Sequence, residues 1–141
     1  MQETPTYTLH KLVFALDRSA DMLLRSQFDI SYSRALILVV LKETPGVTQH
    51  QLAQELGHTD PAVSAMLTEL TKEGYVTSQV SASHKRKKEV HLTPRGQELA
   101  DKMYNYLSGK FESLLETAGI DAKLYHQMTK QIYAALDSGE K

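Results

Sequence analysis

Residues 48–93 read TQHQLAQELGHTDPAVSAMLTELTKEGYVTSQVSASHKRKKEVHLT, and this stretch decides the fold. Thr48, followed by Gln51 three residues later, has the spacing of a capping box, in which two side chains satisfy free amides at a helix start. Leucine and alanine then mark an inner face until Gly57, a residue that commonly ends helices. The stretch therefore begins with a short, well-bounded helix.

A second short helix is predicted immediately afterwards. Asp60 can accept hydrogen bonds from free amides, and Pro61 has φ preset for a first helical turn. The apolar residues that recur at helical spacing predict the buried face: Val63, Met66, Leu67 and Leu70. Small and polar residues are left nearer the outside: Ala62, Ser64, Ala65 and Thr68. Gly74 ends this helix.

The pattern beyond Gly74 has the period of two that is typical of β-strands. Tyr75–Val80 alternates with Val76 and Val80 on one side, and two apolar residues near position 90 repeat the alternation after the basic loop 85–88. A lone ribbon is marginal in water, so we expect it to rest on the helices. Two helices followed by a ribbon with a cationic tip are the order of a winged helix-turn-helix, which places one helix in a DNA major groove.

The flanking sequence predicts further helices. Leucine-rich spacing indicates one helix over about 8–27, Ser31 can cap another that ends at Pro45-Gly46, and Thr93-Pro94 opens one that runs to about Thr117. A last helix follows a break at Gly119 and Asp121. We therefore expect a mainly α fold with a small β-ribbon (α+β), in one domain over 1–141. A winged helix-turn-helix lobe at 30–93 is flanked by long dimerisation helices at 8–29 and 94–138.

The far half of the helix that begins at Pro94 predicts a homodimer. It still carries apolar residues: Leu107, Phe111, Leu114 and Leu115. Burying each is worth about 1.5–3 kcal/mol, so they need a partner surface. Packing the terminal helices against those of a second copy supplies one. The alternative is a larger monomeric core formed by the ends folding back.

Composition excludes several classes of function. The chain has no cysteine, which removes disulfides and thiolate metal sites and suits a cytoplasmic protein. The longest apolar run, 35–41, is far too short for a membrane span, and the polar start is unlike a signal peptide. Six scattered histidines show no metal-binding spacing, and no nucleophile or phosphate-loop motif is present. We expect no enzyme activity, cofactor or metal site.

The net charge of −1 is unusual for a DNA-binding protein, but the charge is unevenly distributed. Between residues 48 and 96, six basic residues face five acidic ones, and four of the six are consecutive at 85–88. From Gln97 onward, five lysines face seven acidic residues. Positive charge is thus concentrated at one loop.

At this level of detail the chain resembles the MarR family of bacterial regulators over essentially its whole length. Ile30-Ser31 with Ile37, Leu38 and Leu41 resembles the second-helix pattern of the family, and Leu52-Ala53 with Leu56-Gly57 resembles its helix-turn-helix entry. The recognition helix and wing are matched by Val63-Ser64, Leu67, Leu70, Gly74-Tyr75-Val76, Lys85-Arg86, Val90, Leu92-Thr93 and Gly96.

The resemblance implies an intertwined, triangular homodimer that binds double-stranded DNA at a palindromic operator, usually as a repressor, and is released by a small-molecule effector. Arg86 matches the wing arginine that enters the minor groove. The residues implied in DNA contact are Thr59, Asp60, Pro61, Ala62, Ser64, Ala65 and Thr68 on the recognition helix, and His84, Lys85, Arg86, Lys87 and Lys88 on the wing. An effector would lie near His10, Tyr32, Arg34 and Tyr104.

Two departures from the family pattern affect this expectation. His84 stands where the family commonly has an aspartate, two residues before the wing arginine. Ala65 and Glu69 occupy positions that are often basic, which leaves Lys72 as the cation of the recognition helix, so phosphate contact would rest on the wing. Two rival functions remain open: a winged helix used for protein interaction without specific DNA binding, and a metal-responsive regulator.

Overall fold

Short-range capping sets the ends of the helices, and most of these signals are legible in the sequence. The Ser31 hydroxyl accepts a hydrogen bond from the Arg34 amide at 3.3 Å, and Thr48 and Gln51 form the predicted capping box. Gly57 has a φ of +67°, a left-handed conformation that lets the chain leave the helix.

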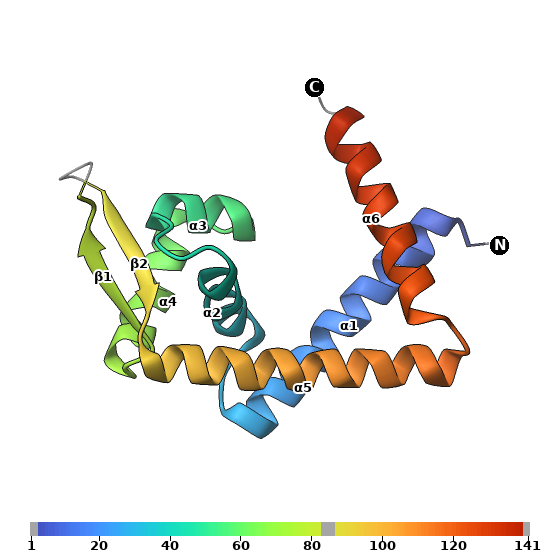
Figure 1. Ribbon diagram of the computed structural model, residues 1–141, viewed down its shortest axis with the longest axis horizontal. Helices are drawn as coiled ribbons and strands as arrows, with labels where there is room; N and C mark the ends of the chain where they lie inside the picture. The colour runs from blue at the N-terminus through green and yellow to red at the C-terminus, as the bar shows by residue number, and fades with distance from the viewer. Residues whose placement is uncertain (1–2, 83–86, 140–141) are drawn as a thin grey trace. The chain divides into compact units, whose positions relative to one another are not determined.

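The computed structural model describes residues 3–82 and 87–139. Within these residues the elements follow one another in the order shown in Figure 1. They are α1 (Pro5–Phe28), α2 (Tyr32–Glu43), α3 (Gln49–Leu56), α4 (Asp60–Lys72), β1 (Val76–Val80), β2 (Lys88–Leu92), α5 (Pro94–Ala118) and α6 (Ala122–Gly139). The mainly helical fold with a small antiparallel sheet confirms the predicted fold class. In the described ranges, no helix combines the length and apolarity needed to cross a membrane.

Contacts divide the chain into two compact units, 1–104 and 105–141. The first unit contains α1 to α4, the ribbon and the first part of α5. The second contains the remainder of α5 and α6. All the residues predicted to touch DNA belong to the first unit.

Helix α1 begins three residues earlier than the predicted start at Thr8. The Thr4 hydroxyl accepts the Tyr7 amide at 3.2 Å and Pro5 occupies the first turn, a start signal that periodicity did not reveal. Near its other end, the Asp21 carboxylate accepts the Tyr32 amide at 2.9 Å and so ties α1 to the start of α2. That hydrogen bond, followed by one from Arg25, lowers the pKa of Asp21.

The core of the first unit draws on every helix in it and on the ribbon. Its largest fully buried side chains are Leu24, Ile37, Leu38, Leu41, Leu52, Val63, Leu70, Val90 and Met103. Val63 and Leu70 come from α4, so this helix is held from one side by α3 and β1, against which it packs. Its opposite side remains free for function.

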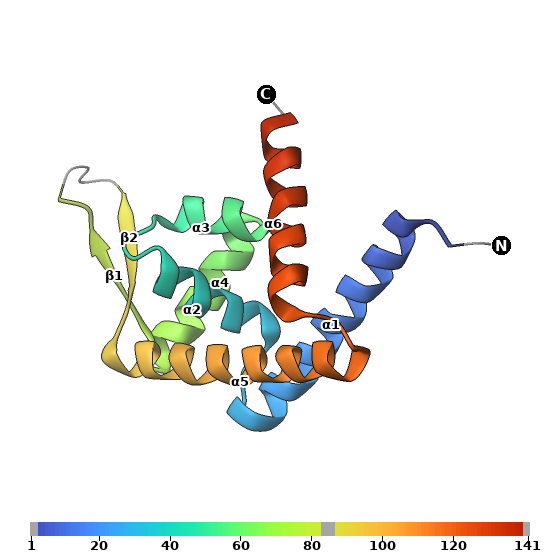
Figure 2. The same cartoon turned by 45° about the vertical axis from the view of Figure 1, so that its right-hand side comes forward.

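The ribbon is anchored to the helices at its base, as its marginal stability in isolation requires. Its two strands pair from Val76 with Leu92 to Val80 with Lys88. The Val90 amide donates to the Val47 carbonyl at 2.9 Å, and an isolated bridge joins Thr48 to Glu89. Figures 1 and 2 both show β2 beside the loop that precedes α3.

The outer end of the ribbon differs from its base. Val76 and Val80 alternate onto one side as predicted, but Val76 is buried whereas Val80 is 59% exposed. The ribbon therefore extends beyond the core that supports its base.

A tight joint connects the ribbon to α5. Thr93 accepts the Gly96 amide at 3.0 Å and donates its hydroxyl to the Gly74 carbonyl at 2.6 Å, which confirms Thr93 as the helix cap. Gly96 lies so close to the Tyr75 carbonyl that a Cβ there would overlap it. The joint thus depends on the absence of a side chain at position 96.

An ion pair fixes α2 to α5 within the first unit. Lys42 lies 2.8 Å from the Asp101 carboxylate and 4.7 Å from the centre of the Tyr104 ring. The hydrogen bond between them raises the pKa of Lys42 and lowers that of Asp101. The ionised Asp101 therefore stabilises the folded state at pH values above its ordinary pKa. This stabilisation is lost as the pH falls through the lowered pKa of the folded protein.

The second unit is a helical hairpin with little core of its own. Asp121 caps α6 by accepting the Leu124 amide at 2.9 Å, and the rings of Phe111 and Tyr125 meet edge to face with centroids 5.5 Å apart. No residue of α6 whose burial is described is buried. Its apolar side chains are 51–73% exposed: Leu124, Met128, Ile132, Tyr133 and Leu136.

We predict that Gly96→Ala lowers the free energy of unfolding by at least about 1–3 kcal/mol, because the added methyl group meets main chain rather than a flexible side chain. Gly109→Ala is the matched control on the same helix. Nothing lies within 4 Å of a Cβ at Gly109, so this change should raise stability by about 0.5–1 kcal/mol. Urea unfolding of both variants measures the difference, and equal stabilities would contradict the close approach.

Candidate nucleic-acid interface

The free side of α4 is small and polar. Ser64, Ala65 and Thr68 are exposed there, while Val63 and Leu67 on the opposite side are buried. Thr59, Asp60 and Pro61 are exposed at the start of the helix, and Ala62 is half-buried. The structure thus brings the seven predicted recognition-helix residues to the first turns of one helix, on or beside its solvent-facing side. Short side chains of this kind allow a helix to approach another surface closely.

The cap of α4 is Thr59 rather than Asp60, so the prediction was one residue too late. The Thr59 hydroxyl accepts the Ala62 amide at 3.2 Å, and Asp60 and Pro61 then occupy the first turn. The Asp60 carboxylate, in the first turn, has a partner on the neighbouring helix. Both of its oxygens lie 3.2 Å from Nδ1 of His50 on α3.

The pair of His50 and Asp60 joins the starts of the two helices of the helix-turn-helix. A carboxylate near a helix N-terminus also interacts favourably with the helix dipole. Both side chains are more than half exposed, so the contact contributes mainly to the position of the two helix starts. It also places the negative charge of Asp60 beside a group that can carry positive charge.

The hydroxyls along α4 are partly committed to the helix itself. Thr68 donates to the Ser64 carbonyl at 3.0 Å, and Thr71 donates to the Leu67 carbonyl at 2.7 Å. The donor of Thr68 is therefore used within the helix, and its oxygen keeps capacity to accept a hydrogen bond. Hydrogen bonds donated to an outside group would have to come from elsewhere on this face, such as Ser64.

A polar groove runs between the start of α3 and the outer end of β2. It encloses about 540 Å³ and is lined by Thr48, Gln49, His50, Gln51, Gln54, Lys87 and Lys88. The two lysines were predicted to lie at an interface, whereas Gln49, His50 and Gln54 were not. Their place just after the Thr48 cap was legible, whereas their position opposite the lysines depends on how the ribbon packs.

The cations around α4 differ in how far they are already neutralised. Lys72 lies 3.8 Å from Glu69, Arg34 lies 3.6 Å from Glu73, and the Arg95 guanidinium stacks 4.8 Å from the Tyr75 ring centre. Lys87 and Lys88 are exposed and have no ion-pair partner among the described residues. Within the described part of the chain, they are the cations best placed to attract an anion in the groove.

Three of the predicted wing residues, His84, Lys85 and Arg86, lie outside the described residues. The ribbon leads directly to them on both sides. The Ser81 amide donates to the Lys87 carbonyl at 2.8 Å, which closes the last described contact between the two strands of the wing. The expectation for Arg86 therefore remains a prediction from the sequence.

Comparison with known proteins adds to this geometry. Residues 28–87 match the model of the MarR family. The chain is similar to Staphylococcus aureus MepR in its DNA-binding conformation, with 26% identity and a TM-score of 0.77 over 96% of this chain and 98% of that one. It is also similar to MepR in the S. aureus MepR–DNA complex, with 25% identity and a TM-score of 0.75 over 97% and 99% of the two chains.

The MarR family is thus the one that this chain matches, through residues 28–87 and through its fold. The chain is a DNA-binding transcriptional regulator with a winged-helix fold. A mutant of Escherichia coli MarR has the same fold, with a TM-score of 0.80 at 20% identity over 96% of this chain and 98% of that one. Among curated proteins, no sequence matches this chain.

The four residues predicted to line an effector site have separate surroundings. His10 borders an open hollow on α1, and Arg34 contacts Glu73. Tyr104 packs beside Lys42, and the pKa of Tyr32 is raised by burial and by the nearby Asp17. An effector site built from all four remains a prediction.

Histidine and carboxylate groups do not cluster in a way that suggests a metal centre. In the described ranges, no group of three or more histidine and acidic side chains is placed to hold an ion. The nearest approaches are pairs, such as His91 with Glu89 at 3.4 Å. One such pair lies on β2, and the pair of His50 and Asp60 joins the starts of α3 and α4.

We predict that Thr59→Ala lowers the stability of the protein by about 0.5–2 kcal/mol, because it removes the side chain that caps α4. Asp60→Ala should cost less, about 0.3–1 kcal/mol, since this residue contributes through the helix dipole and His50. Thr59→Ser keeps the hydroxyl and serves as the control. Thermal unfolding that ranks Asp60→Ala as the more damaging change would restore Asp60 as the cap.

Proposed function

We propose that this protein is a homodimeric repressor that binds a palindromic operator in duplex DNA and is released by a small-molecule ligand. Helix α4 would enter the major groove, and the wing would contact the adjacent minor groove and backbone. The observation that carries the proposal is a small, polar α4 surface next to a groove bordered by Lys87 and Lys88, two lysines with no ion-pair partner in the described part of the chain. The similarity to MepR in a DNA complex supports it.

The recognition surface would read the major groove from the first turns of α4. The residues proposed to approach bases and phosphates are Thr59, Asp60, Pro61, Ala62, Ser64, Ala65 and Thr68. A helix can enter the major groove only where its outer side chains leave room, and alanine, serine and proline do so here. The Asp60 carboxylate at the start of this helix contacts Nδ1 of His50 on α3.

The cationic part of the interface would be the wing. Lys87 and Lys88 are placed to face phosphates from one side of the groove, since they are exposed and border it. His84, Lys85 and Arg86 complete the proposed wing contacts, with the Arg86 guanidinium in the narrow minor groove, where negative potential is concentrated. Positive charge at the ribbon thus compensates for a chain whose net charge is −1.

A second copy of the chain would cover the apolar helices. Five large apolar side chains of α6 are 51–73% exposed, and α1 exposes Tyr7, Leu9, Leu12, Val13, Phe14 and Met22 by 44–70%. Burial of a fully exposed side chain of this kind is worth about 1.5–3 kcal/mol, so covering these partly exposed ones together would favour association by several kcal/mol. A two-fold dimer also presents two α4 helices to successive turns of a palindromic site.

The effector and the setting of the protein complete the proposal. A small molecule near His10, Tyr32, Arg34 and Tyr104 would favour a conformation that fits the operator less well and thereby release the DNA. The protein would act in the cytoplasm, where its operator is accessible. The rival protein-interaction role would require no DNA affinity at all, so binding to duplex DNA distinguishes the two.

We predict that DNA binding depends on the wing. Arg86→Ala should weaken operator binding by about 1–3 kcal/mol. Replacing Lys87 and Lys88 by glutamine should reduce the slope of log affinity against log salt by about one per lysine that contacts phosphate. Fluorescence anisotropy on a duplex selected from a random pool, repeated over a range of salt concentrations, measures both effects.

Lys102→Gln is the matched control for the wing lysines. Lys102 is exposed on α5 and pairs with Glu98 at 3.1 Å, away from the proposed interface, so its removal should leave affinity and salt slope unchanged. Equal behaviour of the wing variants and this control would argue against wing contact. Failure of the native protein to retard any duplex at low salt would favour the protein-interaction role.

We predict that the native protein sediments at twice its subunit mass of 15.8 kDa and that Ile132→Glu dissociates it, because the change places a charge in the apolar face of α6. Gln131→Glu adds the same charge at the neighbouring position, on the polar side of the helix, and should leave the dimer intact. Analytical ultracentrifugation at micromolar concentration tests both. A monomeric native protein would refute the proposed assembly.

A further inference from the structure

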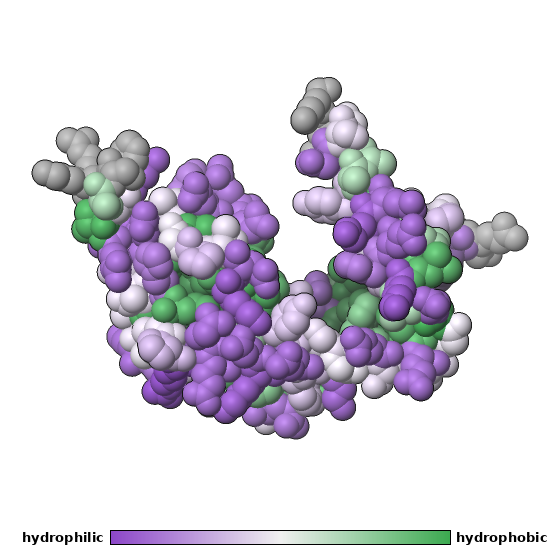
Figure 3. Space-filling view, in the orientation of Figure 1, coloured by the Kyte–Doolittle hydropathy of each residue, from purple (hydrophilic) through white to green (hydrophobic). Residues whose placement is uncertain are grey.

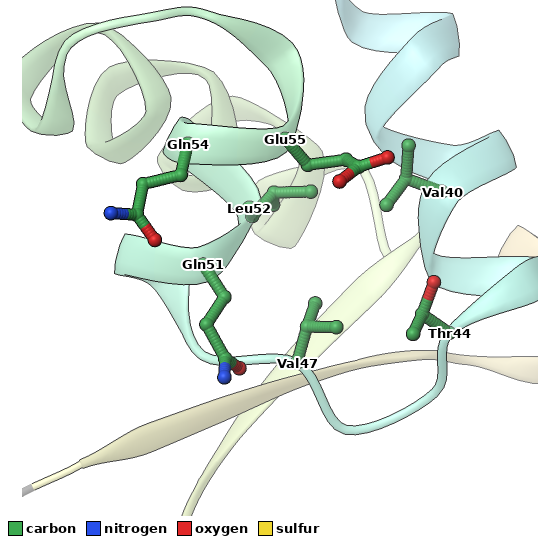
Figure 4. Close-up of a pocket in the computed structure, with 7 residues that line it drawn as sticks. All are labelled: Val40, Thr44, Val47, Gln51, Leu52, Gln54 and Glu55. Carbon is green, nitrogen blue, oxygen red and sulfur yellow. The ribbon is translucent and has the colours of Figure 1, made fainter. Parts of the chain in front are cut away.

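A second hollow lies on the other flank of the helix-turn-helix entry, between α2 and α3. It encloses about 650 Å³, within the range of about 300–1,000 Å³ that is usual for small-molecule sites. Figure 4 shows its walls, with Val40 and Thr44 on one side, Val47 on the connecting loop, and side chains of α3 opposite. It is distinct from the polar groove beside the ribbon lysines.

The floor of this α2–α3 cleft is apolar. Leu52 is fully buried beneath it, and Val40 and Val47 are half-buried at its sides. In Figure 3, green surface is visible between the purple residues of α2 and α3. A ligand seated here would cover apolar surface that is still accessible to water, which favours binding in proportion to the area covered.

The charge of the cleft comes from Glu55. It is the one charged residue in the described lining, and Figure 4 shows its carboxylate extending towards Val40. No described residue forms an ion pair with it, and the nearby α2 cation Lys42 is already paired with Asp101. Gln51 and Gln54 add amide groups that can donate or accept hydrogen bonds, although the Gln51 carbonyl is engaged by the Thr48 amide.

We infer that the α2–α3 cleft binds a small organic cation with an apolar body, whose positive centre faces Glu55 and whose apolar part covers Val40, Val47 and Leu52. Charge complementarity favours this class, because Glu55 repels an anion and attracts a cation, whereas a neutral apolar molecule gains nothing from this exposed carboxylate. The two hollows that flank α3 thus take ligands of opposite charge, phosphate beside Lys87 and Lys88 and a cation beside Glu55.

A ligand bound in the cleft would affect the wing through the main chain. The resulting change in DNA affinity rests on the proposed DNA-binding function. Val47 lines the cleft, and its carbonyl is also the acceptor for the Val90 amide of β2 at 2.9 Å. The next residue, Thr48, bridges Glu89 and caps α3. A ligand that moves this loop therefore shifts the base of the ribbon and the start of α3 together, which changes the fit to DNA.

Two ions of matched shape and opposite charge test the site in the full-length protein. Tetraphenylphosphonium should bind, whereas tetraphenylborate should bind much more weakly, as measured by calorimetric titration without DNA. Glu55→Gln should weaken phosphonium binding about fivefold or more by removing the facing charge. Glu43→Gln removes an exposed carboxylate at the end of α2 that does not line the cleft, and should leave binding unchanged.

Methyl NMR shifts locate the bound ion. Changes centred on Val40, Val47 and Leu52 support the assignment, whereas equal affinity for the two ions, an unaffected Glu55→Gln variant, or shifts centred elsewhere overturn it. The link to the wing is tested by DNA anisotropy with added phosphonium, which should lower the affinity of the native protein but not that of Glu55→Gln. Cation binding by a protein that retards no duplex would refute the proposed function and leave this site standing.

Discussion

The arrangement of the first unit depends on one main-chain contact, the hydrogen bond from the Val90 amide to the Val47 carbonyl. A two-stranded ribbon is barely stable by itself, so it needs a third segment to hold it. The loop before α3 supplies that segment, and its next residue begins the helix-turn-helix. Through this contact, the position of β2 and the start of α3 are set by the same few residues.

The distribution of charge reconciles an acidic chain with a DNA-binding role. The cations of α4 and its neighbours are largely occupied, by Glu69 for Lys72 and by Glu73 for Arg34. Lys87 and Lys88 remain unpaired in the described structure and stand opposite the polar start of α3. Salt screens the interaction between exposed charges beyond about 8–10 Å. The position of Lys87 and Lys88 therefore matters more for binding phosphate than the total charge of the chain.

The sequence was informative wherever the signal was local. The Thr48–Gln51 capping box, the glycine after α3 and the Thr93 cap of α5 all stand as predicted, since each is set by residues within a few positions. The α4 cap was misassigned because Thr59 and Asp60 are adjacent residues that can both cap a helix, whereas the contact between Asp60 and His50 joins two helices and could not be read from the sequence. The polar groove and the α2–α3 cleft likewise arise from packing between elements that are distant in sequence.

The exposed apolar side of α6 also affects how much assembled dimer a cell contains. A newly made subunit of the proposed dimer exposes the apolar face of α6 until it binds a second subunit. During that interval it is susceptible to proteolysis and to aggregation. Pairing follows the square of subunit concentration, so a modest fall in synthesis removes a disproportionate share of the assembled species. The amount of active regulator would then respond more steeply than the amount of its messenger RNA.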